Sequence, residues 1–150
     1  MTEDVREKLK REFSSEEYAA VRDLWKAHSL AEDARDLEGL IATLKPDCVY
    51  EAVPTGHRWE GQDGAREFYR ALLGAFPDVR FALRDIVIGP QGVCEEARLT
   101  GTHERDWLEY AATGRRIDFQ VVIFFPWDPA LALFRGERVH FDPIAAGLIG

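Results

Sequence analysis

The 150-residue sequence has few cysteines, no long apolar run and no excess of positive charge. Its two cysteines, Cys48 and Cys94, form no CxxC motif and no metal-ligand spacing, so we expect two reduced thiols. The longest apolar run covers residues 121–125 and ends at Pro126, whereas a membrane-spanning helix needs roughly 18–20 residues. Acidic residues outnumber basic ones by 27 to 19, which gives a formal net charge of −8. That balance argues against a nucleic-acid-binding or membrane-binding surface, because both need concentrated positive charge.

The remaining composition is that of an ordinary globular domain. Hydrophobic residues make up 46% of the chain and charged residues 31%, and this length corresponds to one domain with its own core. Residues 1–13 are charged and lack the apolar stretch of a secretory signal. We therefore expect a charged N-terminal lead-in at 1–13, with Val5 and Leu9 on one side of a short surface helix, and a single cytoplasmic domain at 14–150.

Three helices are predicted after the lead-in. Ser14 and Glu17 have the spacing of a capping box, and apolar residues continue at helical spacing to about residue 33. A second, shorter helix ends before Pro46, because the residue before a proline disfavours helical geometry. A third helix covers residues 65–76 and ends at the proline that follows.

Alternation of apolar and polar residues predicts five strands, at residues 48–53, 79–88, 93–103, 116–125 and 131–141. Helices followed by a run of strands are typical of an α+β domain. We expect a cone-shaped α+β barrel in which the N-terminal helices pack on a strongly curved antiparallel sheet around an internal pocket. Along 117–125, either alternate set of side chains leaves apolar surface on the outer face. We therefore expect a homodimer through the sheet.

Several motifs occur in the order found in one known family. They are Trp-Lys-Ala-His at 25–28, Thr-Gly-His-Arg-Trp-Glu-Gly at 55–61, Phe-Pro-Asp-Val-Arg-Phe at 76–81, Leu-Thr-Gly-Thr-His at 99–103, Ala-Thr-Gly-Arg-Arg at 112–116 and Glu-Arg-Val-His-Phe-Asp at 137–142. Together these resemble the SnoaL-like polyketide cyclases of the nuclear-transport-factor-2-like, or ketosteroid-isomerase-like, superfamily. The resemblance implies a dimeric α+β barrel with a deep apolar pocket for a small hydrophobic molecule, and no metal or cofactor. It also implies acid–base chemistry in which a proton is taken from a carbon next to a carbonyl.

The same resemblance points to two catalytic residues. His103 ends the Leu-Thr-Gly-Thr-His motif, and Asp118 is the nearest carboxylate on the strand that follows. Asp118 alternates with Gln120 and Val122 on a strand face that is polar at one end and apolar at the other. We expect Asp118 to act as the base and His103 to bind the substrate carbonyl in one cavity. The alternatives are a satisfied histidine at a sheet edge and a carboxylate in water or in the dimer contact.

Further residues combine an apolar body with a polar group, or line a predicted apolar face, and are candidates for ligand binding: Trp25, His28, Tyr50, His57, Trp59, Phe68, Trp107, Gln120 and His140. For each aromatic side chain the alternative is core packing, and for the histidines it is exposure at the surface. The four histidines show no metal-ligand spacing, so no metal site is expected. Glu95 and Glu96 adjoin the turn at Gly92 and are expected to be solvated.

Three functions remain open. The first is a cofactor-free lyase, isomerase or cyclase that acts on a small, polyketide- or steroid-like carbonyl compound by acid–base proton transfer. The second is a non-catalytic protein that binds a small hydrophobic ligand in the same pocket. The third is an epoxide hydrolase with an Asp-Arg-Asp relay. It ranks lower because the adjacent pair Arg84-Asp85 faces opposite sides of a strand.

Overall fold

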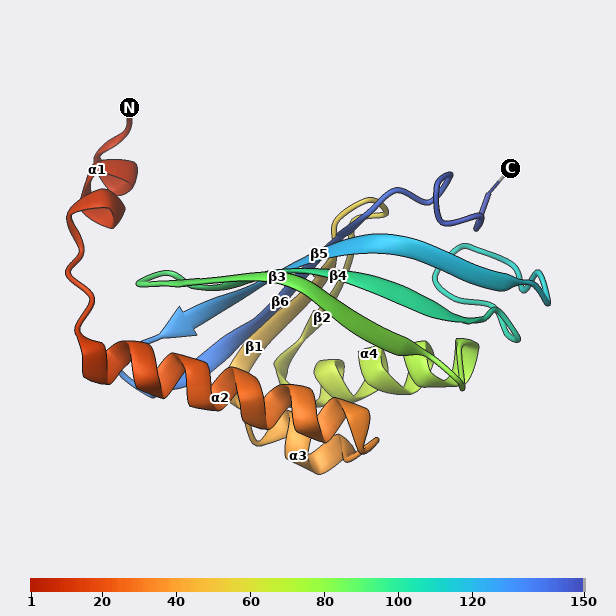
Figure 1. Ribbon diagram of the computed structural model, residues 1–150, viewed down its shortest axis with the longest axis horizontal. Helices are drawn as coiled ribbons and strands as arrows, with labels where there is room; N and C mark the ends of the chain where they lie inside the picture. Colours follow the sequence, from red (N-terminus) through yellow and green to blue (C-terminus); the bar gives the residue numbers. More distant parts are fainter. Residues whose placement is uncertain (150) are drawn as a thin grey trace.

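The computed structural model describes residues 1–149. Its elements in chain order are α1 (Glu3–Lys10), α2 (Ser15–Asp33), α3 (Leu37–Ile41), β1 (Leu44–Ala52), β2 (His57–Glu60), α4 (Gly61–Ala75), β3 (Arg80–Gly89), β4 (Gly92–Thr102), β5 (Arg116–Asp128) and β6 (Leu133–Phe141). The strands form one curved sheet in the order β2-β1-β6-β5-β4-β3 (Figure 1). Because β2 and β3 are edge strands that do not pair with each other, the curved sheet stays open.

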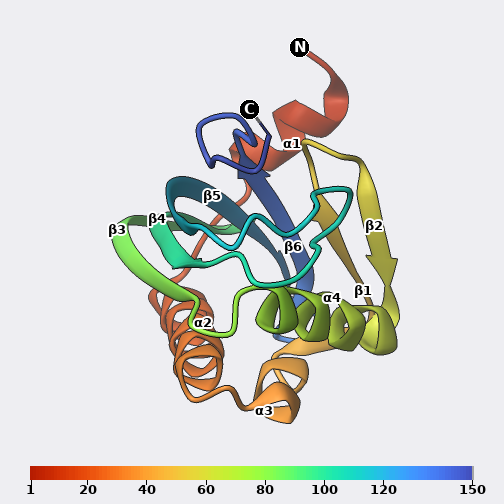
Figure 2. The ribbon, with the colours of Figure 1, turned by 90° about the vertical axis from the view of Figure 1, so that its right-hand side faces the viewer.

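Helices α2, α3 and α4 lie on one face of this sheet, while α1 and the C-terminal segment lie toward its other side (Figures 1 and 2). The predicted α+β fold with helices packed on a strongly curved sheet is confirmed. All strand pairs are antiparallel except β1 and β6, which are parallel. Within residues 1–149, no helix is both long and apolar enough to cross a membrane.

The predicted start of the long helix is confirmed. Ser14 is the N-cap of α2, and its side-chain oxygen accepts a hydrogen bond from the backbone N–H of Glu17 at 3.0 Å. The inward face of α2 buries Val21, His28 and Ala31 against the sheet. The capping residue thus fixes where α2 begins. The apolar face of α2 fixes which side of the helix packs against the sheet.

The segment around Pro46 differs from the prediction. Helix α3 ends at Ile41, and β1 begins at Leu44 and continues through the proline. Pro46 is tolerated because the pairing of β1 with β6 shifts register between Leu44 and Val49, where a proline removes no regular ladder hydrogen bond. The short edge strand β2 was not predicted as a strand.

One alternation decides which side chains of β5 enter the interior. The odd-numbered side chains Ile117, Phe119, Val121, Ile123 and Phe125 are all buried on the helix-covered face. The even-numbered set on the outer face is exposed at Arg116, Asp118 and Gln120, and half-buried at Val122 and Phe124. The outer face is therefore largely polar at one end. The homodimer through the sheet stays a prediction.

Candidate active site

Strands β1 and β6 approach each other closely, and this approach positions Glu137, the first functional side chain of the site. Gly136 in β6 has φ +119°, and a Cβ at this position would overlap the backbone carbonyl of Val49 in β1. Glycine is therefore required where β1 and β6 come together. This pairing sets Glu137 opposite Tyr50, and both side chains are almost fully buried.

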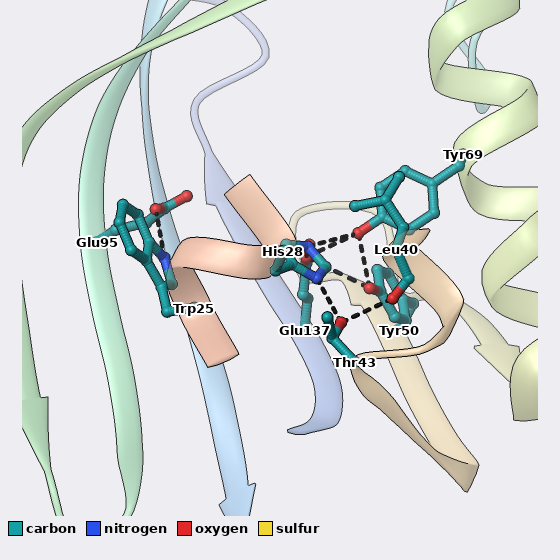
Figure 3. A network of polar contacts seen from close by, with 8 residues as sticks. All are labelled: Trp25, His28, Leu40, Thr43, Tyr50, Tyr69, Glu95 and Glu137. Atoms are coloured by element: carbon teal, nitrogen blue, oxygen red, sulfur yellow. Dashed lines mark hydrogen bonds and ion pairs between the residues drawn. The ribbon is translucent and has the colours of Figure 1, made fainter. Parts of the chain in front are cut away.

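Glu137 is the centre of a buried network of polar contacts (Figure 3). Its Oε1 lies 2.9 Å from Nε2 of His28 on α2 and accepts a hydrogen bond of 2.9 Å from the hydroxyl of Tyr69 on α4. The Tyr50 hydroxyl lies 3.3 Å from the same oxygen and 2.7 Å from the Tyr69 hydroxyl. Side chains from α2, α4 and β1 thus meet at one carboxylate oxygen of β6.

The contacts of His28 determine where its protons lie. Thr43 donates its hydroxyl proton to the Leu40 carbonyl at 2.7 Å, so His28 Nδ1 donates to Thr43 Oγ1, also at 2.7 Å. The other ring nitrogen, Nε2, lies 2.9 Å from Glu137 Oε1 and 3.0 Å from the Tyr69 hydroxyl. His28 therefore links Thr43 to the carboxylate and the hydroxyl of this network.

A second buried carboxylate lies on β4. Glu95 is 8% exposed, and its Oε2 accepts a hydrogen bond from the indole N–H of Trp25 at 3.0 Å. Burial raises the pKa of Glu95 to about 7, the charge of Glu137 adds to the rise, and the Trp25 bond opposes it. Glu95 is therefore suited to take up and release a proton near neutral pH.

Glu32, one helical turn after His28, is the third inward carboxylate, and it is half-buried. Burial raises the pKa of Glu32 well above its usual value, and the nearby charges of Glu137 and Glu95 raise it further, whereas Arg35 opposes the rise. Three carboxylates that face one region repel one another when ionised. Burial and this repulsion therefore favour the protonated form of Glu32.

These groups line two small adjoining cavities of about 20 and 30 Å³, which share Glu32 and Phe81. Each has room for one or two water molecules, so a larger ligand requires the surrounding side chains to move. Apart from Glu32 and Glu137, the first cavity is lined by apolar and aromatic side chains: Phe68, Leu72, Phe81, Leu99, Trp107, Phe119, Val121, Ile123, Val139 and Phe141. The second also contains Trp25, His28 and Glu95.

The buried Glu95 predicts an unusual dependence of stability on pH. Its pKa is about 7 in the folded chain against 4.5 in the unfolded chain, so the folded state binds more protons between these values. The contribution of Glu95 is therefore most favourable below pH 4.5 and falls by ~3 kcal/mol as the pH rises to 7 and above. We expect Glu95→Gln to unfold with the same free energy as wild type near pH 4.5 and to be more stable by that amount above pH 7. Urea unfolding of both proteins at a series of pH values measures this difference, and a pH-independent difference would contradict it.

The structure brings five of the ligand-binding candidates to this interior region. Trp25, His28, Phe68 and Trp107 line the cavities, and Tyr50 belongs to the network beneath them. Their common property is an inward position on α2, α4, β1 or the loop after β4. Sequence periodicity could indicate this position for the two α2 residues, which lie three positions apart.

The other four candidates do not line the cavities. His57 is exposed and contacts Thr55 at 2.8 Å, and Trp59 packs against Phe68 from outside the cavity, at 5.2 Å between ring centroids. Gln120 and His140 lie exposed on the outer face of the sheet. Their expected place in the pocket is wrong for two reasons. Gln120 and His140 occupy the outward phase of their strands, whereas His57 and Trp59 lie opposite Ala52 and Tyr50 on the edge strand β2, away from the cavities.

The expected pairing of Asp118 with His103 in one cavity is also wrong. The register sets Asp118 opposite Thr100, so the carboxylate points away from the helices, and it forms two hydrogen bonds of 2.6 and 3.0 Å to Arg98. The bond to Arg98 lowers the pKa of Asp118, which makes it a weak base. A shift of one residue separates the two faces of a strand, and the resemblance alone did not determine that phase.

His103 is fully buried but does not line either cavity. Its ring stacks on Phe76 at 4.9 Å between ring centroids, and its Nδ1 lies 3.4 Å from the hydroxyl of Thr113. Burial lowers the pKa of His103. The residue therefore packs where the loop after β4 meets α4.

The position of Asp118 leads to a simple prediction. We expect Asp118→Asn to shift the midpoint of thermal unfolding by less than ~2 °C, because an exposed ion pair contributes little to stability. Scanning calorimetry of the variant and wild type at low and high salt measures this shift. A large destabilisation that is independent of salt would mean that Asp118 has a role inside the fold.

The sequence interpretation missed Glu95, Glu137, Glu32 and Tyr69. Glu95 was expected to be solvated, but it is in phase with the buried Val93 and Ala97 along β4. Glu137 is likewise in phase with Val139 on β6. A carboxylate in phase with the apolar residues of a strand is the signal that could have identified both.

Arg84 lies on the outer surface beside Gln120 and Glu96, and Asp85 is exposed, so this pair does not face the cavities. Within residues 1–149, no group of three or more histidine, cysteine, aspartate or glutamate side chains is arranged to hold a metal ion.

Solved structures with this fold include several bacterial proteins. A putative SnoaL-like polyketide cyclase from Jannaschia sp. CCS1 is 19% identical, with a TM-score of 0.77 over 90% of this chain and 94% of that one. A putative polyketide cyclase from Pseudomonas putida KT2440 is 18% identical, with a TM-score of 0.70 over 87% of this chain and 98% of that one. AclR, a putative hydroxylase from Streptomyces galilaeus, is 20% identical, with a TM-score of 0.68 over 87% of this chain and 82% of that one. At these identities the similarity shows a shared fold.

Among curated proteins, none matches this chain in sequence. The profile of the SnoaL-like domain matches residues 21–128, which run from α2 to the end of β5 and include Trp25, His28, Glu32 and Glu95. This match covers most of the chain and agrees with the fold and with the resemblance in the motifs. The chain therefore belongs to the SnoaL-like domain family.

Proposed function

We propose that this protein is a cyclase- or isomerase-type enzyme that moves a proton at the carbon next to the carbonyl of a small hydrophobic compound. One observation carries the proposal: Glu95 and Glu32 line the same cavity, and burial raises the pKa of both carboxyl groups. Because two neighbouring carboxylates repel each other, the ionised form of one favours the protonated form of the other. Such a pair supplies a base and an acid at the same pH. Membership of the SnoaL-like family supports the same class of reaction.

The proposed step uses the chain's own side chains. Ionised Glu95 takes a proton from the α-carbon, so the C–H bond breaks and an O–H bond forms on the carboxyl group. The electron pair moves through the carbon framework to the carbonyl oxygen, which is stabilised as an enol or enolate by the proton of Glu32. Return of a proton to the same carbon regenerates the ketone. Alternatively, this carbon attacks a second carbonyl and closes a ring, and the resulting alkoxide takes the proton from Glu95.

The walls of the cavity contribute to this chemistry. Aromatic and aliphatic side chains exclude water, which strengthens the hydrogen bonds to the developing enolate oxygen. Trp25 holds Glu95 in one orientation through its indole N–H. The contact of 2.9 Å between His28 Nε2 and Glu137 Oε1 holds α2 against β6. The reacting groups are therefore positioned before substrate binds.

A second candidate function is non-catalytic binding of a hydrophobic ligand. It is favoured by the contacts of Glu137 Oε1, which already meets His28, Tyr69 and Tyr50 inside the protein. A buried polar network whose hydrogen-bond partners are already present stabilises a core without taking part in a reaction. The two functions differ in whether a bound ketone exchanges its α-protons.

The test uses 2-tetralone, a bicyclic ketone with acidic α-protons, dissolved in buffered heavy water. Proton NMR follows the loss of the α-proton signal with and without wild-type protein. We expect exchange to be accelerated, and the rate to saturate with ketone concentration. Saturable binding without accelerated exchange would overturn the enzyme proposal in favour of the binding protein, and the absence of both would overturn the two together.

A further inference from the structure

The outer face of the sheet carries a groove beside α1. Its volume of about 510 Å³ lies within the range of roughly 300–1,000 Å³ that small-molecule sites have. Among residues 1–149, the charged side chains that line it are all cationic: Lys8, Arg11, Arg135 and Arg138. The net charge of the chain is −8, so this groove is a local concentration of positive charge on an acidic protein.

A bulge in β6 brings two of these cations to the same face. Phe124 of β5 pairs with Arg138, but Trp127, three residues later, pairs four residues further back on β6. In a regular strand, residues three apart face opposite sides. Here Arg135 and Arg138 are both exposed, and Glu137 between them is buried. The extra residue of β6 therefore sets both guanidinium groups on the outer face, as bulges near functional sites redirect side chains.

The cations of the groove differ in how far their charge is already neutralised. The two near α1 each form an ion pair of 2.6 Å with a carboxylate. Arg135 is less compensated, because its Nε lies 3.8 Å from Asp128 Oδ2, an oxygen that is 3.1 Å from Lys45 Nζ. Arg138 forms no ion pair within residues 1–149, and its guanidinium lies over the Phe124 ring, 4.7 Å from the centroid. The charge open to a ligand is therefore that of Arg135 and Arg138.

The position of Arg138 over Phe124 leaves its donors free. A guanidinium that stacks on an aromatic ring uses its face, whereas its five N–H groups lie in its own plane. These N–H groups match the two oxygens of a carboxylate. Next to them, Phe124, Pro126 and Trp127 give the groove an apolar wall. The groove thus combines an anion-binding edge with a surface on which a flat ring can pack.

We propose that this groove is a second binding site, for a small aromatic anion whose acid group binds Arg135 and Arg138 and whose ring packs on the apolar wall. It lies on the face of the sheet opposite to the interior cavities, so it does not rest on the proposed function. The interior carboxylates Glu32, Glu95 and Glu137 repel an anion, whereas the groove attracts it. The two sites therefore select ligands of different charge.

The test compares 2-naphthoate with 2-naphthamide, which has the same rings and nearly the same shape but no charge. Isothermal titration calorimetry at low ionic strength measures the dissociation constant of each compound. For wild type we expect naphthoate to bind at least about tenfold tighter, as hydrogen bonds between charged groups provide. Added salt should reduce this preference, because it screens exposed charges.

Arg135→Gln and Arg138→Gln each remove one cation and keep a long polar side chain. We expect each variant to bind naphthoate about tenfold more weakly and naphthamide within about twofold of wild type. Arg84→Gln is the matched control, because it removes the same charge from an exposed arginine of β3 that does not line the groove. This control is expected to bind naphthoate like wild type. Circular dichroism verifies that all three variants are folded.

The proposal is overturned if wild type binds the two compounds equally, or if both groove variants keep the wild-type dissociation constant. It is also overturned if Arg84→Gln weakens binding as much as they do, because the effect would then come from net charge. Sedimentation velocity tests the competing occupant, a second copy of this chain. A homodimer that excludes naphthoate and dissociates in Arg138→Gln would replace the anion with that second copy.

Discussion

Replacing Glu95 with glutamine is expected to slow the protein-catalysed exchange of 2-tetralone by about 10²–10⁴-fold, the range for loss of a general base. Glutamine keeps the size of the side chain and an oxygen that accepts from Trp25, but it cannot take the α-proton. In wild type, the base is the ionised form, and the pKa of Glu95 is about 7. The catalysed rate should therefore rise with pH up to about 7 and level off above it, and the variant should lose this dependence.

The chain offers a matched control at the neighbouring position. Glu96 points to the outer face and lies 3.5 Å from Arg84, so Glu96→Gln changes the net charge equally without touching the cavity. Proton NMR rates for Glu96→Gln and for Asp118→Asn should equal those of wild type. A Glu95→Gln protein that binds 2-tetralone and exchanges it at the wild-type rate would exclude Glu95 as the base.

Replacing Glu137 with leucine is expected to destabilise the fold by about 3–5 kcal/mol, the typical result of removing one partner of a buried charged pair. Leucine has a similar volume but leaves His28 Nε2 and the Tyr69 hydroxyl without the oxygen that now lies 2.9 Å from each. The Tyr50 hydroxyl loses a contact as well. Urea unfolding followed by circular dichroism measures the change in the free energy of unfolding.

Glu137→Gln separates the loss of the acceptor from the loss of charge. Its amide oxygen can still accept from Tyr69, so we expect it to cost clearly less than Glu137→Leu. Equal stability of Glu137→Leu and wild type would show that the network does not hold the core together. A larger loss for the glutamine variant than for the leucine variant would mean that burial of a polar group, rather than the network, dominates.

Much of the fold could be predicted from local sequence patterns. The Ser14 capping box located the start of α2, and alternation located β3, β4 and β5 to within a few residues. The prediction failed around Pro46, because a shift in the pairing with β6 makes a proline harmless inside a strand. That shift depends on a partner about 90 residues away in the chain, which local sequence patterns do not describe.

The candidate site was harder to predict from the sequence than the fold. Trp25 and His28, two of the ligand-binding candidates, line the second cavity, and ligand binding by them stays a prediction. Asp118 was assigned from a resemblance whose alignment did not fix the phase of the strand. The observed pairing with Thr100 turns it to the outer face. Both Glu95 and Glu96 were expected to be solvated, although only Glu95 lies in phase with buried neighbours.

The sequence by itself determined the class of the domain, the order of its elements and its family, because capping, periodicity and motif order are local or sequential properties. Only the tertiary structure decided which carboxylates share the interior. Glu32, Glu95 and Glu137 come from one helix and two strands that are not neighbours in the sheet, and their pKa values depend on mutual distance and on burial. Both quantities arise from packing between distant segments, so they exist only in the folded chain.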